Sequence, residues 1–137
     1  MSTYTQAEIN LQKHFKDSWV TAGYSAGIIS FINEDFDKPS NSVWVEFAIV
    51  NASGRRVELG SNDNKLHTGF VDINLHYPED FKGAKPINDY LDAIVGIFEN
   101  QVVSGNHFDD YDGPVGPLKT EKGWLKTNIS FPFQRYG

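Results

Sequence analysis

One short segment holds most of the residue types that bind metal ions. His107 is followed by Asp109, Asp110 and Asp112, and carboxylates at alternate positions beside a histidine are ligand types for a divalent cation. The spacing matches no complete calcium-loop pattern, in which oxygen ligands recur at fixed positions of one loop. We therefore predict a solvated acidic turn with no metal site.

The other histidines show no catalytic arrangement. His67 and His76 fall on or beside one predicted strand, and the odd separation between them puts their side chains on opposite faces. His14 lies beside the apolar stripe of a predicted helix. We expect it at the boundary of the core rather than as a general base.

From the sequence, we also expect no site for a catalytic nucleophile or for phosphate binding that would indicate a reaction. The sequence has no cysteine, and although a Ser-His-Asp triad can converge from distant positions, we expect no G-x-S-x-G nucleophile elbow. The glycines of residues 113–117 are followed by prolines, which cannot present the amide donors that a phosphate needs. We predict that the protein is not an enzyme and has neither catalytic residues nor a cofactor.

The net charge and the lack of long apolar runs limit the kinds of partner that this protein can bind. The 137 residues carry a net charge of -6, which argues against a groove for nucleic-acid phosphates because such binding draws on clustered Lys and Arg. The first residues do not have the pattern of a signal peptide, and no run approaches the roughly 20 apolar residues of a membrane-spanning helix. We expect one domain, residues 1–137, made in the cytoplasm, with no membrane partner and no specific nucleic-acid partner.

Two amphipathic helices are predicted. The first covers residues 6–21, with a capping box at Thr5 and Glu8, an apolar stripe, and Gly23 as a left-handed C-terminal cap. The second covers residues 86–101, with Pro86 at its first position, where a missing amide hydrogen costs nothing. Its wide apolar stripe predicts packing across a sheet.

The remaining apolar segments alternate as strands do. The clearest runs over residues 70–77, and others cover residues 28–33, 43–50 and 125–133. We predict a turn at residues 51–54, turns around one short strand over residues 103–120, and an edge or ladder-free position for Pro132. The fold class predicted is α+β, a mixed, mainly antiparallel β-sheet with two amphipathic helices packed on it.

A few residues are candidates for contacts between subunits. Arg55 and Arg56 lie at the tip of a predicted hairpin, and they either form a solvated turn or meet an acidic surface on a neighbour, such as the loop of Asp109, Asp110 and Asp112. Trp44 and Phe70 point away from the main apolar set of their strands. Either a partner or a second layer of helices would bury them.

Segments spread over the last two thirds of the sequence resemble one family. They are residues 69–78, the helix over residues 87–101 with Asp92 and Phe98, and the Gly123-Trp124 start of a last strand that ends Phe131-Pro132-Phe133. Together they resemble the tail terminator proteins of long-tailed bacteriophages. The resemblance implies a structural virion protein that assembles in the host cytoplasm as a homohexameric ring. Its partners would be itself, the tail tube protein and the head-tail connector protein.

Three other functions fit the same sequence. A head-tail joining protein of the phage neck would share the size, the charge and the ring. A small hydrolase or isomerase would line a pocket with acidic residues and His107. A ligand-binding module would hold an apolar cavity under the second helix.

Overall fold

The computed structural model describes residues 3–31, 36–39, 42–56, 65–80, 84–121 and 123–136. Its elements, in chain order, are α1 (Thr3–Thr21), the short helix η1 (Ala26–Ile28), β1 (Ile29–Phe31), β2 (Trp44–Arg56), β3 (Lys65–Pro78), α2 (Ala84–Phe98), β4 (Val102–Val103), β5 (Asn106–Phe108), β6 (Asp112–Glu121) and β7 (Trp124–Tyr136). The predicted α+β class is confirmed.

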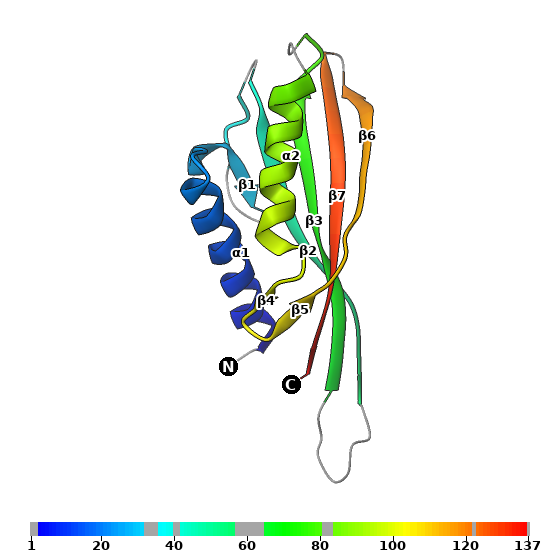
Figure 1. Cartoon of the computed structure of the whole chain (residues 1–137). Coiled ribbons are helices and arrows are strands. Elements are labelled where there is room, and N and C mark those ends of the chain that lie inside the picture. Colours follow the sequence, from blue (N-terminus) through cyan, green and yellow to red (C-terminus); the bar gives the residue numbers. More distant parts are fainter. Residues whose placement is uncertain are drawn as a thin grey trace.

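The strands form one mixed sheet, and both helices lie on the same side of it (Figure 1). The order is β1-β2-β3-β7-β5-β4, with β6 also paired to β7. Only β1 and β2 are parallel among the described pairs; the others are antiparallel. β7 therefore lies inside the sheet, between β3 on one side and β5 and β6 on the other.

Of the two alternatives predicted for Pro132, the edge strand is wrong; Pro132 pairs with Phe70 of β3 but has no described partner on the opposite side of β7. On the side away from β3, β5 pairs with β7 up to Phe133, and β6 pairs with it from Ser130. Pro132 falls between these two partners, where its missing amide hydrogen removes no described pairing to either strand.

The helices begin earlier than their cap signals predict. α1 starts at Thr3, so Thr5 is inside its first turn instead of capping it, while the end at Thr21 and the left-handed Gly23 (φ +100°) are as predicted. α2 starts at Ala84 and ends at Phe98. Pro86 is tolerated as its third residue because first-turn amides have no acceptor within the helix.

The core fills the space between the helices and the inner face of the sheet. At its centre is Phe98 of α2, which is fully buried. Its ring packs against those of Phe15, Phe47, Phe108 and Phe131, at centroid distances of 5.0 to 6.3 Å. Aromatic rings thus occupy the space under α2 in which a ligand-binding module would have its cavity.

The structure has more strand than predicted in two segments, the turn predicted at residues 51–54 and the turns predicted around one short strand over residues 103–120. Residues 51–54 continue β2, and a shift of register between Asn51 and Ser53 marks a bulge that absorbs the turn-prone residues. Residues 112–121 form β6, whose register on β7 shifts three times. Gly113 and Gly116 have φ of +104° and +140°, a backbone conformation that glycine adopts most readily, so the proline-rich segment can follow the edge of β7.

Candidate interaction face

The sheet face that α1 and α2 leave uncovered, here called the outer face, carries an ordered array of side chains. Strand register aligns them in rows across β2, β3, β7 and β6. The rows are Trp44, His76, Lys126 and Leu118; Glu46, Asn74, Asn128 and Val115; Ala48, Asp72, Ser130 and Asp112; and Val50, Phe70 and Pro132. A last row of Thr68, Gln134 and His107 reaches β5.

The middle rows form a hydrogen-bonded network across three strands. Asn128 Nδ2 donates to Asp72 Oδ1 at 2.7 Å and to Asn74 Oδ1 at 2.9 Å. Ser130 Oγ donates to the same Asp72 oxygen at 3.0 Å, and Asn74 Nδ2 donates to Glu46 Oε1 at 3.1 Å. These polar groups satisfy one another, which fixes the register of β2, β3 and β7.

One end of the outer face is aromatic. The rings of Trp44 and His76 stack with centroids 4.0 Å apart, and the ring centroid of Phe36 lies 5.3 Å from that of Trp44. His76 Nε2 is 3.3 Å from Glu46 Oε1. Burial of the imidazole lowers the pKa of His76, although the Glu46 carboxylate acts to raise it.

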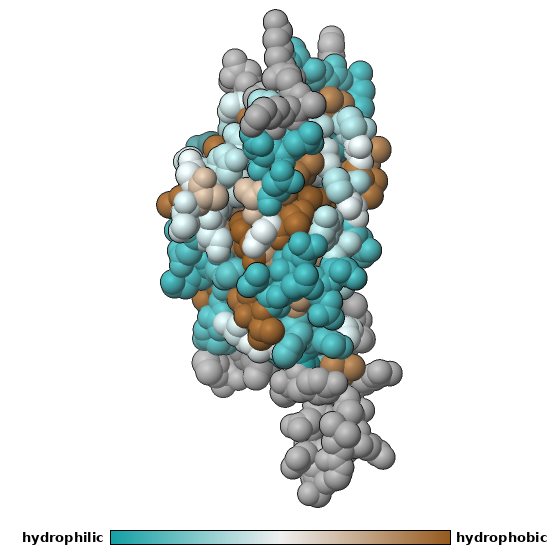
Figure 2. All heavy atoms as spheres, viewed as in Figure 1, coloured by the Kyte–Doolittle hydropathy of each residue, from teal (hydrophilic) through white to brown (hydrophobic). Residues whose placement is uncertain are grey.

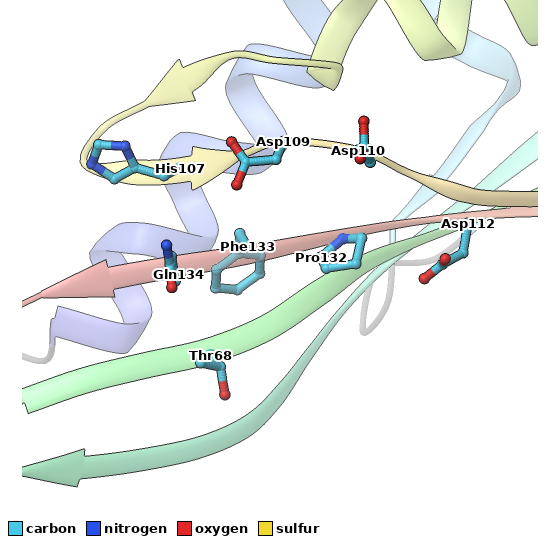
Figure 3. Close-up of a pocket in the computed structure, with 8 residues that line it drawn as sticks. All are labelled: Thr68, His107, Asp109, Asp110, Asp112, Pro132, Phe133 and Gln134. Carbon is cyan, nitrogen blue, oxygen red and sulfur yellow. The ribbon is translucent and has the colours of Figure 1, made fainter.

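The other end is hollowed (Figure 3). A hollow of about 320 Å³ is lined by Thr68, His107, Asp109, Asp110, Asp112, Pro132, Phe133 and Gln134. A second, of about 230 Å³, is lined by Phe70, Asp112, Ser130 and Pro132. They share Asp112 and Pro132, so we treat them as one outer groove. Figure 3 shows Asp109 and Asp110 on the segment after β5, with β7 between them and Thr68.

Four of the seven predicted interface residues meet in this groove. Phe70, Asp109, Asp110 and Asp112 all line it. Trp44 is on the same face but at its opposite end, six residues along β2 from the row of Phe70, or roughly 20 Å away. No layer of helices among the described residues covers Trp44 or Phe70, and both side chains are half-buried.

Arg55 and Arg56 are not at a hairpin tip. They lie within β2, paired with Leu66 and Lys65 of β3, and their side chains are outside the part of the structure that is described. The residues that follow, 57–64, are also outside it. The two arginines therefore stand at the described end of a long β2–β3 ladder.

Sequence reasoning missed the polar network and the exposed apolar residues of β6. Val115 and Leu118 are 54% and 47% exposed, and Figure 2 shows hydrophobic residues at the edge where Figure 1 places β6. Alternating polar residues in β3 and β7 signalled the network. Which of them would meet depended on strand register, which the sequence alone did not reveal.

Three histidines have the positions that the sequence predicted. His67 is buried, while His76 faces the outer face, on the opposite side of β3. His14 Nε2 lies 3.0 Å from the Ile97 carbonyl, and its ring is 5.6 Å from that of Phe98, at the boundary of the core.

Two possible chemical sites remain to be placed. No group of His, Asp and Glu side chains among the described residues is arranged to hold a metal ion. The expectation about the nucleophile elbow overlooked residues 23–27, which read G-Y-S-A-G. Ser25 follows a helix rather than a strand, has an extended backbone, and its Oγ accepts from the Gly27 amide as the cap of η1. This is a helix cap, because an elbow requires a strand-to-helix turn.

Comparison with known proteins shows the fold alone. No family model and no curated protein matches the sequence. One solved structure, of a protein whose name gives no function, superposes with a TM-score of 0.70 over 98% of this chain and 96% of its own, at 15% sequence identity. No helix in the described part of the chain is long and apolar enough to cross a membrane.

Proposed function

We propose that this chain is a non-enzymatic assembly protein of a bacteriophage, a tail terminator. It forms a ring, a homohexamer, on the last ring of tail tube protein and stops the growth of the tube. The ring then presents the surface to which the head-tail connector protein attaches. It assembles in the host cytoplasm and remains in the tail of the virion.

The observation that carries the proposal is the outer face. Its central polar groups are bonded to one another, while Val115, Leu118 and the Trp44 ring offer apolar and aromatic surface along its margin. Aromatic residues are enriched in protein interfaces relative to the rest of the protein surface. A surface of this kind suits contact with a protein better than a reaction.

The family resemblance adds support, because its separate segments are neighbours in the fold. Residues 69–78 lie in β3, residues 87–98 lie in α2, and residues 124–133 lie in the paired strand β7. The resembling positions therefore describe one connected half of the molecule rather than scattered matches.

The test is to prevent the synthesis of this chain in cells infected by the phage that encodes it. The particles in the resulting depleted lysate are then imaged. We expect tails longer than normal and without heads, and normal tails when the protein is supplied again. Tails of normal length beside unattached full heads would instead support the head-tail joining function. Intact virions would contradict both functions.

A further inference from the structure

We infer that copies of this chain join when the β2–β3 arm of one copy lies in the outer groove of the next. The arm is defined as residues 54–56 of β2 with residues 65–67 of β3, paired from Gly54 and His67 to Arg56 and Lys65. The inference rests on the proposed function and names the surfaces that would hold its ring together.

The groove requires an occupant that is basic and partly apolar. Its described lining contains the carboxylates of Asp109, Asp110 and Asp112, all exposed, and no Lys or Arg. Phe70 and Pro132 supply apolar surface between β3 and β6. A basic side chain with a long aliphatic stem satisfies both features, because the stem covers the rings while the charge meets the carboxylates.

The arm carries that chemistry. Arg55, Arg56 and Lys65 are three of the 12 Lys and Arg residues of the chain, and they share the last two described rungs of the ladder. Figure 1 shows the arm continuing beyond the lower ends of both helices. Its last rung, Arg56 with Lys65, lies beyond the described pairing of β3 with β7, so docking against a neighbour would stabilise that end.

The occupant is a second copy, since the arm leads away from its own groove. Thr68 lines the groove and pairs with Ser53 at the base of the arm. Arg56 lies three residues farther along β2, roughly 10 Å beyond that base. A contact between two different patches, arm and groove, is heterologous and closes into a ring when the rotation between copies permits. Opposite charges then fix the register.

Charge reversal on each side tests the contact. The arm variant is Arg55→Glu with Arg56→Glu, and the groove variant is Asp109→Lys with Asp110→Lys. We expect the wild-type protein to form an oligomer at low salt, by light scattering over a concentration series, and each variant to remain monomeric with an unchanged circular dichroism spectrum. A control with the same charge change away from the groove, Asp80→Lys with Asp92→Lys, should assemble like the wild type.

Mixing decides whether arm and groove meet. In an equal mixture of the two variants, each reversed arm matches a reversed groove and each native arm matches a native groove, so we expect the oligomer to return with an even number of subunits. A mixture of folded variants that stays monomeric overturns the inference, as does a monomeric wild type or a variant that assembles alone.

Cross-linking gives a second measure, because the chain has no cysteine. Arg56→Cys mixed with Asp110→Cys should give a disulfide-linked dimer at least tenfold more readily than Arg56→Cys mixed with Asp92→Cys on α2. Equal yields overturn the arm-in-groove contact. Neither assay involves a tail, so a charge-matched oligomer together with intact virions in the depleted lysate would reject the terminator function while leaving the contact in place.

Discussion

The imidazole of His76 lies flat on the indole of Trp44, with ring centroids 4.0 Å apart and planes inclined by 6°. The side chain of His76 is only 12% exposed in this stack, while its Glu46 neighbour is 47% exposed. The pair joins β2 to β3 at the aromatic end of the outer face. Burial lowers the pKa of His76, so this stack favours the neutral imidazole.

Stability should fall as the pH drops below 6.5, in part because of His76. Its pKa is lowered from 6.5 in the folded protein, chiefly by burial, with Lys126 and Lys38 opposing the charged form and Glu46 favouring it. The unfolded chain therefore binds the proton more readily than the folded protein. The contribution of neutral His76 to stability is fully present above pH 6.5 and is lost as the pH falls from that value through the folded pKa.

Urea unfolding at pH 7.5 and 5.5 measures this loss. We expect the midpoint of the wild type to fall more between these pH values than that of His76→Gln. The matched control is His107→Gln, which changes an exposed histidine and should fall as the wild type does. An equal decline in all three proteins would exclude His76 as the cause.

Phe98→Ala should cost about 3 to 5 kcal/mol in the free energy of unfolding, because the cavity would open among four aromatic rings that cannot all move into it. Val102→Ala is the comparison: Val102 is 63% exposed and should change stability by less than about 0.5 kcal/mol. Chemical denaturation of both variants checks the difference, and similar losses would contradict the packing around Phe98.

Two glycine-to-alanine changes should act in opposite directions. A Cβ at Gly69 would lie 2.4 Å from the Val50 carbonyl oxygen and 2.9 Å from Phe133 Cζ, while one at Gly96 has no atom within 4 Å. We expect Gly69→Ala to lower stability by about 1 to 3 kcal/mol and Gly96→Ala, inside α2, to raise it by about 0.5 to 1 kcal/mol. Thermal unfolding compares them, and a stabilised Gly69→Ala protein would contradict the close approach of β2 and β3.

Asn128→Asp should destabilise the polar network more at pH 7 than at pH 4. The change replaces the amide that donates to Asp72 at 2.7 Å by a second carboxylate, and the repulsion is relieved once either group is protonated. Asn128→Ala loses the same donor without adding charge, so its cost should depend less on pH. Chemical unfolding of both variants at pH 7 and pH 4 measures these losses of stability. If the loss changes with pH equally in both variants, repulsion between the two carboxylates is not its cause.

Local patterns in the sequence predicted the elements whose faces are set by their own residues. The alternation over residues 70–77 placed Val71, Ile73 and Leu75 in the core, where they are buried. Gly23 ended α1 as its conformational freedom predicted. These features depend on residues that are close together in the sequence, so each could be predicted from its own segment alone.

The full length of β6 and the interior place of β7, which depend on pairing between strands, were not predicted. β6 is a strand because the edge of β7 is available to it, and β7 is interior because β3, β5 and β6 all pair with it. The same applies to the site. Phe70 and Asp112 were singled out separately, and only the register of β3, β7 and β6 brings them into one groove.

The place of β7 has a consequence for how the protein is made. β7 pairs with β3, β5 and β6, yet it follows all the other described elements in the chain. During translation, β3 keeps one edge unpaired and β6 has no strand to rest on until residues 124–136 leave the ribosome. Such edges attract other strands, so the nascent chain is open to misassociation and to chaperones until β7 has emerged.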